Sequence, residues 1–264
     1  MSVGFRRIDR GRGHTYLDDA GRKLTGVTTV LKTLPKDALI NWAAGTTAEY
    51  AVDHWEELST KSPSARLKAI TGARWSVVRE ASAKGTRIHA LADELVRGGT
   101  IVAPPELMPY VDGYARWLDA THVETLWTEA VVGDPGVGVC GTVDLGIRWP
   151  DGTTEIADIK TGKGVYDEVR LQLAAYRYMP TMMIDGDPHP MPKVDRAAVL
   201  HVTKEGTYHH IVEAGTMEYY AFTALLEVYH WLEECSGGIA EPTETGPLAK
   251  WWIVEPSNDV GDEP

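Results

Sequence analysis

Two short segments in the middle of the sequence, Gly141-Thr142-Val143-Asp144 and Asp158-Ile159-Lys160, carry two carboxylates and an ammonium group. The turn sequence Pro150-Asp151-Gly152 joins the two segments, because proline fixes φ and glycine accepts a positive φ. A hairpin centred on Asp151 places Asp144 opposite Asp158, with Cβ atoms about 4.5–5.5 Å apart. Lys160 projects from the same face as Asp158, because alternate residues of a strand share a face.

Like charges that face each other across a sheet destabilise it unless a positive charge lies between them. Asp144 and Asp158 therefore predict a divalent cation between their carboxylates, which are the hard oxygen ligands that Mg²⁺ or Mn²⁺ prefers. We expect Lys160 to point at the substrate group on which the metal-dependent reaction takes place. These three charged side chains lie on a sheet that is otherwise suited to burial, and this indicates a functional site.

The elements that must position these residues follow from hydrophobic periodicity and from turn residues. The predicted order is a strand at Val123–Val132, strands at Val137–Trp149 and Thr153–Thr161, a helix at Val165–Met179, strands at Ala197–Thr203 and Tyr208–Glu213, and a helix at Met217–Cys235. With a helix before the first strand, the central order is helix, three strands, helix and strand. This order indicates an α/β fold in which helices flank a mixed sheet.

The first half of the chain is mostly helical by periodicity. A hairpin is predicted at His14–Val27, followed by helices at Lys36–Glu57, Pro63–Thr71, Ala73–Arg97 and Glu106–Ala120. Gly72 is expected to separate the second helix from the third. Gly85 lies inside the third helix, where glycine costs about 1 kcal/mol relative to alanine, and this indicates close approach of another backbone or a ligand. His89 follows four residues later on the same face.

Composition and charge limit the possible classes of protein. The chain has 264 residues and 43% hydrophobic content, enough for one large domain with an appendage. No apolar run reaches the roughly 18 residues of a membrane helix, and the first residues lack the apolar region of a signal peptide, so we expect a cytoplasmic protein. The net charge of −12 argues against a nucleic-acid partner. However, Ile211–Pro264 alone carries −10 and Lys61–Ala90 carries +6, so that basic segment is either a phosphate-binding face or a solvated helix surface.

Taken in order, His89, Asp144, Asp158-Ile159-Lys160 and Gln172-x-x-x-Tyr176 resemble the PD-(D/E)XK nuclease superfamily. They look in particular like its RecB-like exonuclease branch, which includes RecB-type exonucleases associated with CRISPR systems and many bacteriophage recombination nucleases. The Asp-x13-Asp-x-Lys pattern alone is weak, but Gly-Thr-x-Ile-His, Gly-Thr-Val-Asp and Gln-x3-Tyr accompany it on suitable elements. The resemblance covers roughly Ala73 to Glu213 and implies a restriction-endonuclease-like αβββαβ core.

The resemblance also implies a role for each of these residues. A Mg²⁺ or Mn²⁺ ion would be held by His89, Asp144, Asp158 and the backbone carbonyl of Ile159, and the imidazole ligand would favour Mn²⁺. Such an ion lowers the pKa of bound water and acts as a Lewis acid. Lys160 would orient the water or neutralise the developing charge on the phosphate. Two residues of the following helix would complete the catalytic set, Gln172 by contacting the nucleophile or a phosphate, and Tyr176 by supporting the DNA strand.

The chain departs from the CRISPR-associated members in its cysteines. Those members commonly hold an iron–sulfur cluster on four cysteines, whereas this chain has only Cys140 and Cys235, so we expect no such cluster. Two further acidic residues, Asp93 and Glu129, are interpreted as surface residues in preference to carboxylates that support the metal ligands. The predicted division of the chain is an N-terminal hairpin with helices at 1–72, a nuclease core at 73–235, and a C-terminal packing segment with an acidic tail at 236–264.

These observations predict a metal-dependent DNA exonuclease, encoded by a bacteriophage and serving recombination, replication or repair in the cytoplasm of a bacterial host. Its expected partners are DNA and a phage recombination or single-strand-binding protein. A structure-specific or nicking endonuclease on the same fold is one alternative, and a catalytically silent DNA-binding or assembly protein is another. The basic segment near His89 argues against a metal hydrolase that acts on other substrates.

Overall fold

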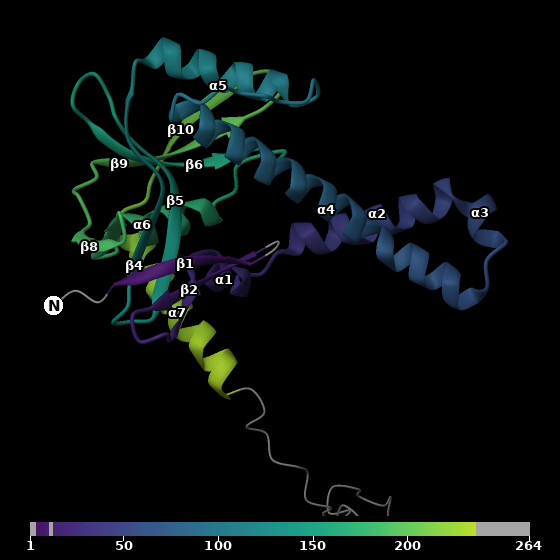
Figure 1. The fold of residues 1–264 in the computed structure, drawn as a ribbon. Helices are drawn as coiled ribbons and strands as arrows, with labels where there is room; N and C mark the ends of the chain where they lie inside the picture. The colour runs from purple at the N-terminus through teal and green to yellow at the C-terminus, as the bar shows by residue number, and fades with distance from the viewer. Residues whose placement is uncertain (1–3, 11–12, 236–264) are drawn as a thin grey trace, which may run out of the picture.

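The computed structural model describes residues 4–10 and 13–235. They form a mixed sheet of ten strands with helices packed on both of its sides, which confirms the predicted α/β class (Figure 1). The predicted C-terminal packing segment and acidic tail at 236–264 lie outside the described residues. Among the residues described, no helix is both long and apolar enough to cross a membrane.

The central part of the sheet follows the predicted order of elements. Its strands and their helix are β4 (Glu124–Asp134), β5 (Val139–Arg148), β6 (Thr154–Lys160), α6 (Glu168–Tyr178), β9 (Arg196–Val202) and β10 (Thr207–Val212). In space the strands lie in the order β10-β9-β6-β5-β4. β6 and β9 are parallel, as the connection through α6 requires, and the other pairs in this group are antiparallel.

The hairpin between β5 and β6 has the predicted register. Leu145 pairs with Ala157 and Arg148 pairs with Thr154. One step further along the same register, Asp144 stands opposite Asp158. The backbone pairing between the two strands ends at this step, because the N–H of Ile159 donates to the Asp144 carboxylate instead of to a backbone carbonyl.

The strand β5 changes its partner at the position of the acidic residues. Its first two residues, Val139 and Cys140, pair in parallel with β3 (Lys23–Gly26), and its last four pair with β6. Between these two ladders, residues 141–144 have no strand partner on that side within the described chain, although β4 pairs with β5 on the other side. The sheet therefore forks at Asp144, and the fork leaves room for side chains.

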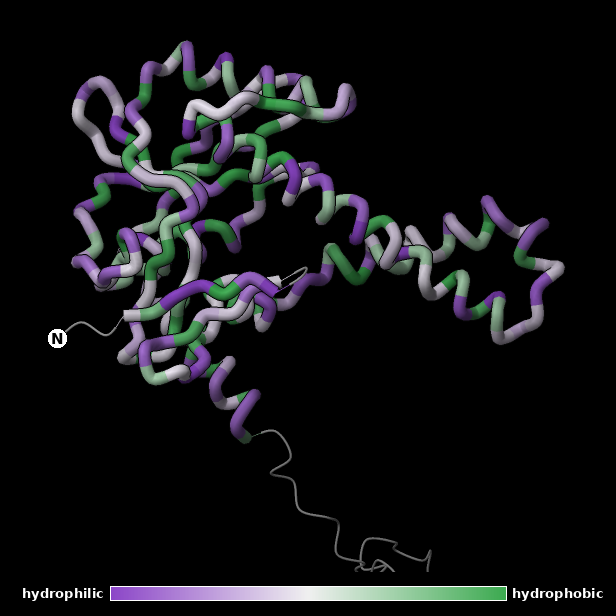
Figure 2. Tube along the Cα trace, viewed as in Figure 1, coloured by the Kyte–Doolittle hydropathy of each residue, from purple (hydrophilic) through white to green (hydrophobic). Residues whose placement is uncertain are grey.

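Two apolar layers cover the two faces of the sheet. On one face, Leu145, Ile147 and Ile159 pack against α4 (Pro63–Val96) and α5 (Met108–Thr121). On the other face, Ile156 and Val199 pack against α6 and against α7 (Thr216–Cys235). Figure 2 shows that hydrophobic segments concentrate along these central strands and the helices next to them. The fork of β5 is reached by side chains from both layers.

The N-terminal part adds strands to the sheet and then leaves it. β1 (Phe5–Arg10), β2 (Gly13–Asp18) and β3 form an antiparallel group that joins β5, of which only the β2–β3 hairpin was predicted. α1 (Val27–Val30) and a 3-10 turn at Leu31–Thr33 lead to α2 (Asp37–Asp53) and α3 (Trp55–Ser59). These two helices and the first part of α4 project from the body (Figure 1). We call residues 37–80 the helical arm.

The expected break at Gly72 is wrong. α4 runs without interruption from Pro63 to Val96, capped at its start by Ser62, so the predicted boundary between residues 72 and 73 falls inside a helix. No atom outside the helix lies within 4 Å of a Cβ built on Gly72, so the glycine meets no obstacle there. Its cost of about 1 kcal/mol is small against the hydrogen bonds of a 34-residue helix.

A second hairpin was also missed by the sequence patterns. β7 (Thr181–Ile184) and β8 (Asp187–Pro190) lie between α6 and β9 and extend the sheet beyond β4. Their turn places both Asp185 and Gly186 at positive φ, which is the geometry of a tight hairpin turn. This hairpin lies on the far side of β4 from the fork, so it does not contribute to the site described below.

Candidate metal-dependent active site

Asp144 is the centre of a polar cluster at the fork. Its Oδ2 accepts a hydrogen bond of 2.7 Å from the backbone N–H of Ile159 and lies 3.5 Å from Nδ1 of His89. Burial, followed by repulsion from Asp158, raises the pKa of this carboxyl well above its ordinary value. The site therefore disfavours a negative charge on Asp144 unless a cation compensates it.

Asp158 is more deeply buried, with only 3% of its surface exposed. Its Oδ1 accepts a hydrogen bond of 2.7 Å from the side-chain amide of Gln172, and its Oδ2 lies 2.7 Å from Nζ of Lys160. That ion pair does not have the geometry of a hydrogen bond, so Oδ2 has no hydrogen-bond partner within the described residues. A buried carboxylate oxygen in this state is suited to a cation.

Gln172 and Tyr176 lie one turn apart on α6 and share one face, as predicted. The Gln172 amide also donates to the Tyr176 hydroxyl at 3.2 Å, and its Oε1 accepts from Lys160 Nζ at 3.4 Å. Gln172 thus links three of the predicted residues. Burial and the nearby carboxylate of Asp158 raise the pKa of Tyr176 well above its ordinary value, so its hydroxyl keeps its proton.

Gly141 explains how Tyr176 reaches this position. A Cβ built on Gly141 would overlap the ring of Tyr176, so only glycine at this point of β5 lets the ring lie against the strand. The buried ring closes one side of the site.

His89 comes from α4 on the opposite side of the sheet. Its helix approaches the end of β6 at Gly85, where a Cβ would lie 3.2 Å from the Thr161 hydroxyl oxygen, so the neighbour is a side chain and not the expected backbone or ligand. Burial lowers the pKa of His89, against the opposing effect of Asp158. A neutral imidazole is the form that can bind a metal.

Glu129 is a member of the site that the sequence interpretation missed. His89, Glu129 and Asp144 each offer one metal-ligand atom, and these three atoms lie within 4.8 Å of one another. The backbone of Glu129 has a positive φ of 48° within β4. Its neighbours Thr128 and Ala130 pair with Leu145 and Val143 of β5. The interpretation of Glu129 as a surface residue is therefore replaced. Asp93, the other acidic residue set aside, forms an ion pair of 2.9 Å with Arg97 instead.

The N-terminal strands supply the outer wall of the site. Arg7 Nη1 lies 2.9 Å from Glu129 Oε2 and 3.5 Å from the hydroxyl of Thr142. The hydroxyl of Tyr16 lies 2.8 Å from that of Thr142, and burial raises the pKa of Tyr16 to about 12. No feature of the sequence pairs a residue near position 7 with β4, so spacing alone could not have identified Arg7.

The donor set is suited to Mg²⁺ or Mn²⁺. Two carboxylates and an imidazole lie within reach of a common point, and oxygen with one nitrogen ligand suits these ions. Compared with the predicted set, His89 and Asp144 lie together and Glu129 joins them, whereas Asp158 is held by Gln172 and Lys160. Ile159 contributes its N–H to Asp144. The fit rests on His89, Glu129 and Asp144, whose ligand atoms lie within 4.8 Å of one another.

Comparison with known proteins adds little to this geometry. No family model matches the sequence, and no curated protein matches it. A solved structure described as "Crystal structure of SSO0001" is similar, with 14% sequence identity, a TM-score of 0.34, and coverage of 79% of this chain and 75% of that chain. Similarity at this level supports no statement about the fold or the function of this protein.

Proposed function

We propose that this protein is a metal-dependent DNA exonuclease that hydrolyses phosphodiester bonds. The observation that supports this most is the convergence of Asp144, Asp158, Lys160 and Gln172 with His89 at the fork of β5. The proposal extends to a role in phage recombination, replication or repair, in the cytoplasm of a bacterial host and beside a recombination or single-strand-binding protein. The resemblance in the order of these residues to RecB-like nucleases supports that setting.

The chemistry assigns a task to each side chain. When bound, Mg²⁺ or Mn²⁺ would supply a more acidic bound water and a Lewis acid at the phosphate. His89, Glu129 and Asp144 would hold it, and Asp158 lies opposite Asp144 with its Oδ2 2.7 Å from the ammonium of Lys160. Lys160 has 37% of its side chain exposed, so its ammonium group can contact an entering phosphate while remaining 2.7 Å from Asp158.

Gln172 fixes the orientation of the catalytic groups. Its amide nitrogen donates to Asp158 and its amide oxygen accepts from Lys160, so a carboxylate and an ammonium are both held by one side chain. Tyr176 accepts a hydrogen bond from Gln172, and its buried hydroxyl keeps its own proton. These contacts hold the carboxylate and the ammonium in place before substrate arrives.

An assay on labelled DNA tests the proposal. With Mg²⁺ or Mn²⁺, the protein should release nucleotides from end-labelled linear DNA and leave circular single-stranded DNA intact. Asp144→Ala, Asp158→Ala and Lys160→Ala should each abolish release while circular dichroism shows an unchanged fold. Full activity in any of the three variants overturns the assignment.

Two alternatives give different results in the same experiments. Cleavage of circular DNA indicates a structure-specific or nicking endonuclease on this fold. Failure to bind Mn²⁺ in a calorimetric titration indicates a catalytically silent DNA-binding protein. The pair of Lys160 and Asp158 favours a catalytic role over a purely DNA-binding one. Burial of the Asp158 carboxylate costs free energy, and the fold does not require a charged residue at this position.

A further inference from the structure

Three carboxylates occupy one row across the central strands. Glu129 stands opposite Asp144 in the register of β4 and β5, because the residues on each side of Glu129 pair with the residues on each side of Asp144. Asp144 in turn stands opposite Asp158 of β6. Each end of the row has a cation, since Arg7 Nη1 lies 2.9 Å from Glu129 and Lys160 Nζ lies 2.7 Å from Asp158. Arg7 therefore corresponds, at the β4 end of the row, to the lysine that we propose contacts the substrate at the β6 end.

Arg7 has hydrogen-bond capacity that the protein does not use. A guanidinium carries five N–H donors in a planar fork. The Nε of Arg7 donates to Asp9, and its Nη1 donates to Glu129 and, at 3.5 Å, to the hydroxyl of Thr142. Within the described residues, the two N–H groups of Nη2 donate to no acceptor, and 28% of the side chain is exposed. The open edge of the guanidinium can therefore bind a further anionic group.

The β1–β2 hairpin directs Arg7 toward the candidate site. Arg7 and Tyr16 are partners across the two strands, and the hydroxyl of Tyr16 lies 2.8 Å from that of Thr142 in β5. Arg6 is exposed and belongs to the other face of β1, because successive residues of a strand alternate between its faces. The hairpin thus carries one arginine that faces the metal ligands and a neighbouring one that faces away from them.

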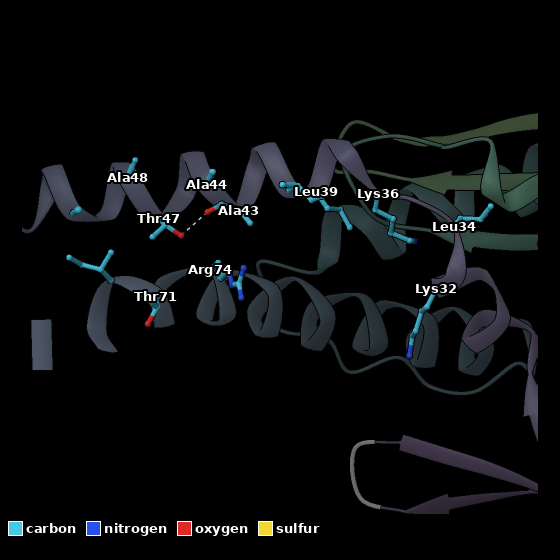
Figure 3. Close-up of a pocket in the computed structure, with 13 residues that line it drawn as sticks. Lys32, Leu34, Lys36, Leu39, Ala43, Ala44, Thr47, Ala48, Thr71 and Arg74 are labelled. Carbon is cyan, nitrogen blue, oxygen red and sulfur yellow. Dashed lines mark hydrogen bonds between the residues drawn. The ribbon is translucent and has the colours of Figure 1, made fainter. Parts of the chain in front are cut away.

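The N-terminal segment is cationic in an otherwise acidic protein. Residues 1–36 contain eight Lys or Arg and three Asp or Glu, a net charge of +5, whereas the whole chain carries −12. Two of these cations serve other places. Lys36 forms an ion pair of 3.0 Å with Glu168, and Lys32 lines the groove between α2 and α4 in the helical arm (Figure 3). The charge of the segment favours the approach of an anion to the side of the site that β1 and β2 form.

We infer that Arg7 is a substrate-binding residue, which exchanges Glu129 for a phosphate of the DNA when the metal site is filled. In the metal-free protein, Arg7 is the cation paired with Glu129. Glu129 attracts Arg7 less once its charge is compensated by a divalent ion, so the pair between them weakens. The guanidinium then matches the geometry of a phosphate, to which it can donate two parallel N–H bonds. The inference rests on the proposed function for the identity of its substrate.

Arg7 and Lys160 serve different phosphates in this arrangement. Their carboxylate partners, Glu129 and Asp158, lie two strands apart, which is roughly 10 Å across a sheet. One phosphate group does not span that distance. Arg7 therefore holds a phosphate next to the one that is hydrolysed, and its loss should affect binding of the substrate more than the chemical step.

Calorimetric titration with Mn²⁺ alone tests the exchange at Glu129. Arg7→Ala should bind Mn²⁺ about twofold to fivefold more tightly than the wild type, because a cation that competes for Glu129 is removed. A residue that only positions Glu129 would give the opposite sign, a loss of Mn²⁺ affinity. Arg6→Ala removes the same charge from the other face of β1, so its Mn²⁺ affinity should equal that of the wild type. Equal or weaker Mn²⁺ binding by Arg7→Ala overturns the inference.

DNA binding is measured with Mn²⁺ in a Lys160→Ala background, where we expect no hydrolysis. The probe is a fluorescein-labelled oligothymidylate of about 20 nucleotides, followed by fluorescence anisotropy. Arg7→Ala should lower the slope of log K against log salt concentration by about 0.7, the loss of one phosphate contact, whereas Arg7→Lys should keep the slope. In EDTA, where Arg7 stays paired with Glu129, Arg7→Ala should change the slope less. An unchanged slope in Mn²⁺, or an equal change in both conditions, overturns the inference.

These measurements separate the inference from the proposed function. If the wild type releases no nucleotides with Mn²⁺ but Arg7→Ala shows tighter Mn²⁺ binding and a lower salt slope, the nuclease assignment fails and the Arg7 assignment stands. If the wild type releases nucleotides and Arg7→Ala changes neither quantity, the Arg7 assignment fails alone. During turnover Arg7→Ala should raise KM more than it lowers kcat, and a loss confined to kcat overturns the assignment. Should Arg7→Ala fail to fold, Arg7→Gln repeats each measurement, because its amide still donates to Glu129 without the charge.

Discussion

Arg7 and Glu129 form an ion pair of 2.9 Å although 122 residues separate them in the sequence. The pair joins the first strand of the protein to the carboxylate that stands beside Asp144 in the candidate metal site. Without a metal ion, Arg7 supplies the positive charge nearest to Glu129. With an ion bound, that charge becomes less important.

Arg7→Ala should therefore destabilise the metal-free protein more than the Mn²⁺-bound protein. The expected loss is about 1 kcal/mol or less without metal, because both partners are partly exposed. Thermal unfolding in EDTA and in Mn²⁺ measures the two values, with Arg6→Ala as a control at an exposed neighbouring position. An equal loss in both conditions would show that Arg7 serves the fold and not the site.

Asp144→Asn should stabilise the metal-free protein, and increasingly so as pH rises. The pKa of Asp144 is raised in the folded state, so the folded protein binds this proton more tightly than the unfolded chain. Wild-type stability should fall as pH rises from about 4 through the folded pKa, and the variant lacks this loss. Each 1 kcal/mol relieved should raise Tm by about 2–4 °C.

Asp151→Asn provides a comparison, because the pKa of Asp151 is shifted in the opposite direction to that of Asp144. The backbone N–H of Thr153 lowers the pKa of Asp151, so the stabilisation by Asp151 is present above its ordinary pKa and is lost as pH falls. Unfolding in EDTA from about pH 2 to pH 8 measures both variants, because the loss at Asp151 falls below about pH 4 and the loss at Asp144 lies above it. A difference between Asp144→Asn and wild type that is constant with pH contradicts the assigned burial.

Gln172→Ala should affect both stability and catalysis. It leaves Asp158 Oδ1 without its amide donor in a buried position, at a cost of about 1–3 kcal/mol. DNA hydrolysis should fall further than stability explains, because Lys160 also loses a contact. Arg170→Ala on the same helix, where the side chain pairs with Glu213 and Glu218 at the surface, is the control. Normal hydrolysis in Gln172→Ala would remove Gln172 from the mechanism.

Gly141→Ala should displace Tyr176 and disturb the site from β5. The added Cβ overlaps the ring, and overpacking of a buried contact costs about 1–3 kcal/mol. Gly164→Ala, where no atom lies within 4 Å of the added Cβ, should leave unfolding unchanged. The double variant Gly141→Ala, Tyr176→Leu should recover part of the stability, and no recovery would show that the overlap is not the cause.

The parts of the fold that could be predicted are those set by local chemistry. A three-residue turn and the alternation of apolar residues determined the register that places Asp144 opposite Asp158. The helical spacing of Gln172 and Tyr176 likewise needs no information from the rest of the chain. Gly72 was interpreted as a break because glycine has a low helix propensity. The helix that contains it is long enough to accommodate this cost.

The parts that could not be predicted depend on distant segments. Glu129 enters the site through a positive φ inside a strand, which neither alternation nor residue type indicates. Arg7 reaches the site only because β3 pairs with β5 across more than a hundred residues. The short β7–β8 hairpin contains two prolines in β8, which weakened its strand pattern.

The fork of β5 also has a consequence for handling the protein. Because β3 pairs with the first residues of the strand that carries Asp144, the N-terminal strands form part of the wall of the candidate site. Purification tags and fusion partners are therefore better attached behind the last helix. Removal of the first two dozen residues would take Arg7 and Tyr16 away from the candidate site, although His89, Glu129 and Asp144 would all remain in the chain.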